Sequence, residues 1–557
     1  MCGLVCFAAT AIAGGQPAGQ PPAAPAPALS AQGDAGHGED TSLLTVAERT
    51  SFETTARYDD VVELLKRLDE LSPLAKFTTI GETTQGRAIP MLVIADPPVE
   101  IDRVDRGVDA DTASGGPERL TVLAIGNIHG GEVDGKEALP MLAREILTRP
   151  DAPENRALLD KLILLVVPIY NCDGNERVAE GSRGPQNGPR VTGARENAQD
   201  LDLNRDFIKL AAPETRALVS VINQWDPALF IDCHITNGSF HRYIVTYAGA
   251  KLPAGDARVV DYTRQRLFPE ISSDFAGRTE FESFWYGNFN GEWSDHSQDH
   301  TRWESFPAEG RFGTNYVGLR NRLSVLVETY TYAPFEERVR ATQEFVRSTL
   351  NVVAARADEV KRLLARVDVD ASFEAGPDAI AIKAKESPWP EKVEIAGYVE
   401  EVVDGRRRAT SQPREYTVEL WDRYEPAAKV DRPYAYAIPP QYTRAIDTLK
   451  LHGVWASTLD RDVEVEAEVY RVDSATPASR EFQGHVLVDL SVTPRREKRT
   501  LPAGWVLVRG RQTLGNLAVY LLEPHSDDGL ARWNFFDAGV KAGEDFPVVR
   551  VISPPSE

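Results

Sequence analysis

Four short stretches of the chain are apolar at nearly every position, without the alternation expected of half-exposed strands. They lie at residues 120–125, 162–169, 229–231 and 324–327. Continuous apolar runs of this length are typical of strands buried on both faces of a largely parallel sheet. Helical patterns lie between them, for example over residues 137–147. Alternating strands and helices predict an α/β domain with a mixed, largely parallel sheet flanked by helices.

Other patterns mark the two ends of this domain. Apolar residues at helical spacing predict an amphipathic helix over 57–71, and two strands joined at Gln85-Gly86-Arg87 are predicted to follow as a hairpin. One long helix is predicted to close the domain. Its apolar stripe steps by four and three through Val346, Leu350, Val353, Ala357, Val360 and Leu364.

After Asp368 the hydrophobic pattern changes to a period of two. Apolar and polar residues alternate over 462–470 and 485–490, which is typical of half-buried strands. We therefore predict a boundary near residues 368–375, with a first domain over 43–368 and a β-rich C-terminal domain over 369–557. The second domain is expected to pack on the first rather than to catalyse.

The N-terminus resembles an export signal. Residues 1–14 are apolar and small, and residues 15–42 form a linker rich in Pro and Ala. No basic residue precedes the apolar stretch, which departs from the usual signal pattern. This segment predicts a secreted or periplasmic protein.

Composition narrows the classes of function. The 557 residues include 84 acidic and 62 basic side chains, giving a formal charge of −22. Such a charge argues against nucleic acid or an anionic membrane as the partner, since both need a basic surface. Beyond the N-terminus no apolar run approaches the ~20 residues that span a bilayer. Four cysteines are too few for a disulfide scaffold.

Candidate chemistry gathers where the predicted buried strands end. His129 and Glu132 follow the first such strand, His234 ends the third, and Glu328 ends the fourth. In α/β sheets, ligands bind beyond the carboxyl ends of the strands. Two histidines and a glutamate are an established ligand set for catalytic zinc, which lowers the pKa of bound water to about 7. His129, Glu132 and His234 fill the ligand roles, and Glu328 remains as the general base.

Five ordered motifs resemble the zinc carboxypeptidase family of the carboxypeptidase A type. They are Ile80-Gly-Glu-Thr-Thr-Gln-Gly-Arg, His129-Gly-Gly-Glu132, Asp202-Leu-Asn204-Arg205, Asp232-Cys-His234 and Val327-Glu328-Thr329. The resemblance covers about residues 57–365 and not the C-terminal domain. It implies one zinc ion on His129, Glu132 and His234, with Glu328 as general base.

The resemblance also implies roles around the metal. Asp202 would hold the far nitrogen of His129, while Asn204 and Arg205 would hold the free C-terminal carboxylate of a peptide substrate. For the oxyanion we expect Arg195, with Arg183 and Arg190 as competitors in the same loop.

Some features leave alternatives open. Tyr316 is a candidate for the family's substrate-contacting tyrosine, although its spacing to Glu328 is short. Eleven aromatic residues within positions 275–316 either line the cleft or form a separate hydrophobic cluster. The resemblance places the His129 strand between Cys172 and Cys233, which predicts two free thiols.

The sequence therefore predicts a zinc metallocarboxypeptidase. The alternatives are a zinc amidohydrolase of N-acyl amino acids or cell-wall peptides and, third, a non-catalytic binding module.

Overall fold

The computed structural model describes residues 41–101, 119–236, 238–289, 300–373, 378–404 and 406–554. The predicted signal segment lies outside these ranges, as does the predicted linker apart from its last two residues.

An eight-stranded mixed sheet forms the core of the first region, in the order β1-β2-β4-β3-β7-β12-β8-β9. The four inner strands β4, β3, β7 and β12 are parallel to one another, and β1 and β2 form the antiparallel hairpin at one edge. The bounds are β1 (Ala75–Glu82), β2 (Ala88–Ile94), β3 (Leu120–Gly126), β4 (Leu162–Val167), β7 (Leu229–Thr236), β8 (Val245–Ala248), β9 (Ser283–Trp285) and β12 (Leu323–Tyr330). The four apolar stretches of the sequence are these four parallel strands, which confirms the predicted fold class.

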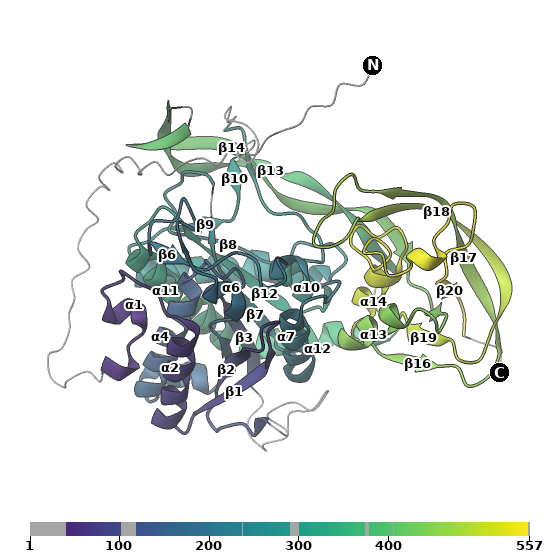
Figure 1. The fold of residues 1–557 in the computed structure, drawn as a ribbon, viewed down its shortest axis with the longest axis horizontal. Coiled ribbons are helices and arrows are strands. Elements are labelled where there is room, and N and C mark those ends of the chain that lie inside the picture. Colours follow the sequence, from purple (N-terminus) through teal and green to yellow (C-terminus); the bar gives the residue numbers. More distant parts are fainter. Residues whose placement is uncertain are drawn as a thin grey trace.

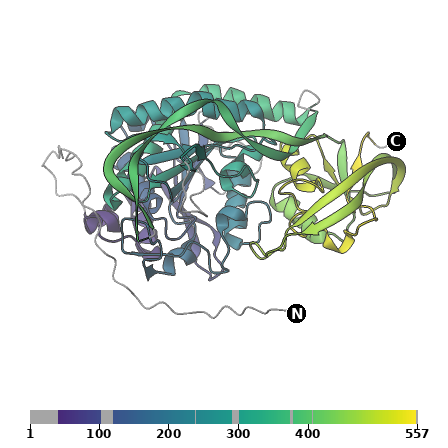
Figure 2. The ribbon, with the colours of Figure 1, turned by 90° about the horizontal axis from the view of Figure 1, so that it is seen from above.

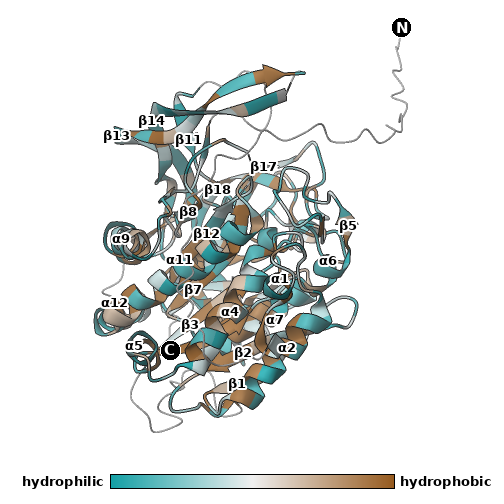
Figure 3. Ribbon diagram, turned by 90° about the vertical axis from the view of Figure 1, so that its left-hand side faces the viewer, coloured by the Kyte–Doolittle hydropathy of each residue, from teal (hydrophilic) through white to brown (hydrophobic). Residues whose placement is uncertain are grey.

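Helices cover both faces of this sheet (Figure 1). One face carries α2 (Tyr58–Leu71), α4 (Asp134–Thr148) and α11 (Phe335–Ala355), and the other carries α7 (Pro213–Trp225) and α10 (Gly313–Leu319). Hydrophobic residues concentrate in the central strands and in α4 (Figure 3). Shorter elements are α1 (Val46–Arg49), α5 (Pro153–Leu159), α6 (Cys172–Glu176), β5 (Ala179–Glu180), β6 (Val191–Thr192), α8 (Ala257–Tyr262), α9 (Phe268–Arg278), β10 (Asn288–Phe289) and β11 (Arg302–Glu304).

The predicted closing helix is two helices, α11 and α12 (Ala357–Ser372), interrupted at Arg356. The Arg356 amide donates to the carbonyls of both Val352 and Val353, so the last turn of α11 tightens before α12 begins. All six residues of the predicted apolar stripe are nevertheless buried. The stripe therefore predicted the buried face correctly and missed the break.

A long antiparallel hairpin leaves the end of α12 and crosses the first region (Figure 2). Its strands are β13 (Ala379–Val403) and β14 (Arg406–Asp431), and β14 also pairs in parallel with β11. The change from helix to strand thus falls near the expected boundary. The hairpin, however, is hydrogen-bonded to the first region, so a clean division at residue 368 stays a prediction.

The C-terminal region is rich in strands and packs beside the first region. Its six-stranded sheet has the order β16-β19-β15-β20-β17-β18. The bounds are β15 (Ala435–Ile438), α13 (Thr443–Leu451), β16 (Ala456–Thr458), β17 (Val463–Pro477), β18 (Val488–Leu501), β19 (Val506–Arg509), α14 (Gly515–Leu522) and β20 (Val549–Val551). Buried polar contacts join the regions: His452 contacts Tyr316 and the carbonyl of Ile208, and Arg311 forms an ion pair with Asp528.

Two further observations bear on the sequence predictions. Cys172 follows β4 and Cys233 lies on β7, with β3 between these two strands, and both thiols are free and buried, as expected. Over the ranges that the structure describes, no helix is long and apolar enough to cross a membrane.

Candidate active site

A tight loop between β3 and α4 carries His129 and Glu132. The side chain of Asn127 closes the loop by donating to the carbonyls of His129, Gly130 and Glu132 at 3.0–3.3 Å. Gly130 is required here because a Cβ at this position would lie only 2.3 Å from the carbonyl carbon of Gly174. The loop therefore holds both side chains above the end of the sheet.

Two neighbouring parallel strands supply the remaining candidates. His234 lies near the end of β7, and Glu328 is its register partner on β12. Each is at most 9% exposed. Parallel pairing thus places the third candidate ligand and the candidate base next to each other.

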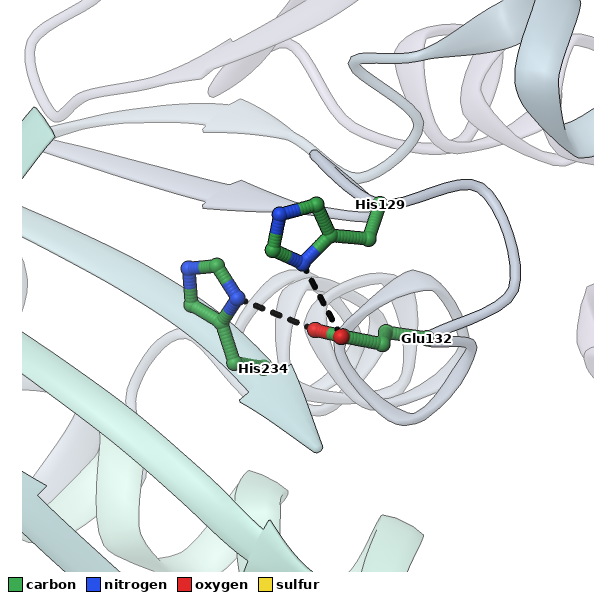
Figure 4. A group of neighbouring side chains, drawn as sticks. All are labelled: His129, Glu132 and His234. Atoms are coloured by element: carbon green, nitrogen blue, oxygen red, sulfur yellow. Dashed lines mark hydrogen bonds and ion pairs between the residues drawn. The ribbon is translucent and has the colours of Figure 1, made fainter. Parts of the chain in front are cut away.

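The three candidate ligands converge in the structure (Figure 4). The Glu132 carboxylate lies between the two imidazoles, with one oxygen 2.9 Å from Nδ1 of His129 and the other 2.9 Å from Nδ1 of His234. All three side chains are buried, and their ligand atoms lie within 4.8 Å of one another.

This arrangement fits zinc. Two imidazole nitrogens and one carboxylate oxygen are the donors of a catalytic zinc site with one open position. Ligand atoms around a tetrahedral zinc lie about 3.4 Å apart, close to the separations seen here. The histidines and Arg183 outweigh the effect of burial and hold the pKa of Glu132 well below its usual value, so that it is a carboxylate ready to bind a cation.

Carboxylates behind the two histidines orient their rings. Asp202 Oδ1 lies 3.1 Å from Nε2 of His129, which is the position expected from the sequence. Asp232 Oδ2 lies 2.9 Å from Nε2 of His234. Asp232 belongs to one of the five motifs but had no predicted role. Its spacing of two from His234 on one strand was the available signal, since such residues share a face.

The environment of Glu328 suits proton transfer. Burial, together with the nearby Glu132 charge, raises its pKa to about 8, against the opposing effect of His234. A carboxyl group with a pKa near neutrality can both accept and return a proton.

A cleft of about 490 Å³ opens in front of these residues. Asn204 and Arg205, the residues expected to hold a substrate carboxylate, line it, and both belong to the short turn Leu203–Arg205 that follows Asp202. The Arg205 guanidinium lies 4.1 Å from the centre of the Phe312 ring, and Asn204 Oδ1 accepts from the amide of Gly313 at 2.9 Å. These contacts fix the direction in which the turn presents its donors.

The three arginines considered for the oxyanion differ in position. Arg195 lines the cleft and donates to Asp202 through Nε and Nη2 at 3.1 and 2.7 Å. Arg183 also lines the cleft and donates to Glu132 at 2.7 Å. Arg190 pairs with Glu180 on the surface. The structure thus brings two of the three arginines to the site.

Tyr316 does not reach the cleft. It is fully buried, with its hydroxyl 2.9 Å from Nδ1 of His452 and 3.2 Å from the guanidinium of Arg320. The reason is helical phase: Thr314 on α10 lines the cleft, and a residue two positions later points about 200° away around the helix.

Tyr286 lies in the cleft instead. Burial and the Glu328 charge raise its pKa, so its hydroxyl stays protonated and can donate. It follows β9 at the edge of the sheet, in the aromatic-rich segment of the sequence. No spacing rule singled it out among the eleven aromatic residues there.

That aromatic segment serves both of the roles considered for it. Tyr286, Phe306 and Phe312 line the cleft. Phe289 and Trp303 belong instead to a separate cluster under the hairpin, with Tyr416 and Leu420 of β14.

Fold and site together define a class. A buried His–Glu–His metal site beside a glutamate, at the carboxyl ends of parallel strands, is typical of a metal-dependent hydrolase. Residues 61–323 match the family model for zinc carboxypeptidase. Residues 61–323 therefore form a zinc carboxypeptidase domain, and the protein is a hydrolase of the metallocarboxypeptidase class.

Relatives extend the comparison beyond the first region. Carboxypeptidase 2 of Trichophyton tonsurans is 24% identical over 461 residues, covering 78% of this chain and 77% of that protein. That alignment is longer than the first region, so the likeness includes part of the C-terminal region. Human carboxypeptidase D is 33% identical over 172 residues, covering 28% of this chain and 12% of that protein.

Solved structures with partial likeness include a metallo-carboxypeptidase from Burkholderia cenocepacia and the carboxypeptidase A of Helicoverpa armigera. Each is 17% identical, with TM-scores of 0.39 and 0.38. They align with 54% and 55% of this chain, and with 69% and 75% of their own chains.

Proposed function

We propose that this protein removes C-terminal residues from peptides, with one zinc ion held by His129, Glu132 and His234 and with Glu328 as general base. The observation that supports this most directly is the convergence of the three buried ligand atoms next to Glu328, at a cleft that Asn204 and Arg205 line. When bound, zinc supplies a Lewis acid that polarises a carbonyl and lowers the pKa of water.

Asn204 and Arg205 bind the substrate's free carboxylate. A guanidinium meets a carboxylate with two parallel donors, and the neighbouring amide adds another. Because Phe312 packs on the Arg205 guanidinium, the charged group is held in place before substrate arrives. Anchoring the terminal carboxylate here sets the last peptide bond above Glu328.

Glu328 moves the proton. It accepts one from the attacking water and returns it to the leaving amine. Its elevated pKa makes Glu328 a stronger base for the first transfer, and it remains close to the pKa of about 8 of an α-amino leaving group, so the proton can still pass on.

Arg195 stabilises the charge that develops on the peptide oxygen. Asp202 fixes its guanidinium through two hydrogen bonds, so this donor is oriented before the reaction. Arg183 lies in the same cleft and is the second candidate for this role.

The cleft favours an apolar C-terminal side chain. Phe306, Phe312 and Leu326 line it, and Glu132 and Glu328 are the two carboxylates among its described lining residues. Both are committed to the metal and to proton transfer, so a basic side chain would find no free partner. We also propose export, from the apolar N-terminal segment.

The test is hydrolysis of blocked dipeptides that end in Phe, Leu, Arg or Glu, with and without a chelator. Each peptide is paired with its C-terminal amide, which lacks the charge that Arg205 binds. We expect chelator-sensitive release of Phe and Leu from the free acids, with Arg205→Ala lowering kcat/KM about 10- to 100-fold. Faster release from muropeptides or N-acyl amino acids would favour the amidohydrolase alternative, and no release from any substrate would contradict the proposal.

A further inference from the structure

The C-terminal region reaches the active site through one side chain. The Oε1 atom of Gln483 accepts a hydrogen bond from the backbone amide of Asp202 at 2.8 Å, across 281 positions of sequence. Asp202 is the residue whose carboxylate lies behind the candidate ligand His129. The contact therefore joins the two regions directly behind the metal site.

Gln483 lies in a turn whose shape is well defined. Phe482 and His485 exchange two backbone hydrogen bonds, at 2.8 and 3.1 Å, around the two central residues. Both central residues, Gln483 and Gly484, have positive φ, at 53° and 78°. This is the geometry of a type I′ turn, and the Gln483 side chain extends from it to the Asp202 amide.

Aromatic contacts hold this turn within the C-terminal region, and Arg311 joins it to the first region. The rings of Phe482 and His485 pack against Trp533. The Arg311 guanidinium lies 5.3 Å from the Phe482 ring and 5.1 Å from the Trp533 ring, and it pairs with Asp528 at 2.9 Å. Arg311 immediately precedes Phe312 of the cleft, so the same anchor supports the cleft wall.

The Asp202 carboxylate contacts three groups of the site. Its Oδ1 contacts Nε2 of His129 and accepts from the amide of Asn204 at 2.9 Å, while its Oδ2 binds Arg195. Displacing the Asp202 backbone would therefore shift the candidate ligand, the substrate turn and the oxyanion arginine together.

We propose that Gln483 is a positioning residue of the metal centre, holding Asp202 and, through it, the imidazole of His129. The C-terminal region is then part of the active site and more than a packing partner. This inference rests on the metal ligands proposed above. Removing a group that hydrogen-bonds to a metal ligand typically lowers metal affinity 10- to 100-fold. Gln483 is one hydrogen bond further from the metal, so we expect a smaller effect in the same direction.

The experiment uses full-length protein and four variants. Gln483→Met keeps the length of the side chain and removes the acceptor, whereas Gln483→Glu keeps an acceptor. Asp202→Asn sets the scale of the effect, and Glu481→Gln, on an exposed side chain in the same segment, is the matched control. The measurements are the zinc dissociation constant by chelator competition, the visible spectrum of the cobalt-loaded protein, and the melting temperature.

We expect Gln483→Met to weaken zinc binding about fivefold and to change the cobalt spectrum, with Asp202→Asn stronger in both. Gln483→Glu and Glu481→Gln should stay within about twofold of the parent. Zinc affinity and spectrum unchanged in Gln483→Met would overturn the inference, as would equal losses in the Met and Glu variants. A parent protein that binds no zinc would overturn the proposed function as well, so the two failures are distinct.

Discussion

Each of the two regions buries a cluster of charged residues, and the clusters differ in their surroundings. In the first region, His129, Glu132, His234 and Glu328 face a cleft of about 490 Å³. In the C-terminal region, the fully buried Glu523 accepts from the hydroxyls of Tyr436 and Tyr470 at 2.6 and 2.9 Å, with Arg550 at 3.2 Å.

The difference shows what distinguishes a site from a structural network. Both clusters have shifted pKa values, since burial raises the pKa of Glu523 as well as that of Glu328. Glu523 is surrounded by protein donors that use its lone pairs. The ligand atoms of the first cluster converge beside open space. Shifted pKa values alone would have marked both clusters as candidate functional sites.

The largest expected effect is in the first cluster. Glu328→Gln should lower kcat by about 10²- to 10⁴-fold, because the amide cannot accept the proton. Zinc content and melting temperature should stay close to those of the parent protein, since Glu328 is not among the converging ligands. Steady-state kinetics with metal analysis checks this, and a variant that keeps more than a tenth of the activity would remove Glu328 from the mechanism.

The matching change in the Glu523 cluster should lower the stability of the fold and leave the catalytic activity unchanged. Glu523→Ala leaves Arg550 buried without its central partner, which should cost about 3 kcal/mol of unfolding free energy. Arg550 keeps its contact with Glu468, so the loss stays at the lower end of the usual range. Denaturant unfolding measures it, with Glu466→Ala on the exposed face of β17 as control. Loss of bound zinc from folded Glu523→Ala would show that the two clusters are coupled.

A third prediction concerns the interface between the regions. His452 is fully buried; its Nε2 lies 3.0 Å from the Ile208 carbonyl, and burial lowers its pKa from 6.5 to about 3. The unfolded chain gains a proton as pH falls below 6.5, whereas the folded protein does not until about pH 3. His452 therefore contributes a loss of stability as pH falls, about 2 kcal/mol between pH 6.5 and 5.

The test compares the parent with His452→Gln, which is uncharged at every pH and can still donate to a carbonyl. We expect the variant to be less stable at pH 7 and to lose less stability on acidification. Parallel pH profiles of the denaturation midpoint would show that folding does not lower the pKa of His452.

The smallest expected effect is the difference between removing the hydroxyl of Tyr286 and removing that of Tyr316. Tyr286→Phe should lower kcat/KM about fivefold, the value of one hydrogen bond of about 1 kcal/mol. Tyr316→Phe should leave the kinetics unchanged and lower the melting temperature, because it removes the hydroxyl bound to His452. Equal kinetic losses in both variants would contradict the assignment of Tyr286 to the cleft and of Tyr316 to the interface.

The local hydrophobic pattern predicted the first region well, because each candidate ligand lies at the end of a strand that this pattern reveals. Apolar runs marked the four parallel strands, and the ligands lie where those strands end, so the sheet itself brings them together. Phase on a helix is less certain at the ends of a short element. Tyr316 was a candidate by resemblance alone, and its phase on α10 turns it away from the cleft, whereas no spacing singled out Tyr286.

Contacts between distant segments left no trace in the local pattern. The pairing of β11 with β14 spans more than 100 positions, and nothing near Gln483 in sequence points to Asp202. Register and docking of this kind depend on the packing of the whole chain, which no window of a few residues contains.

The distance between Asp202 and Gln483 also has a consequence during synthesis. A ribosome adds about 5–20 residues per second, so the Asp202 amide is made roughly 15–60 s before its partner side chain. The parallel sheet can assemble in that interval, because all of its strands precede residue 331. The nascent chain therefore contains the candidate metal ligands early, and the Gln483 contact behind them can form only when translation is almost finished.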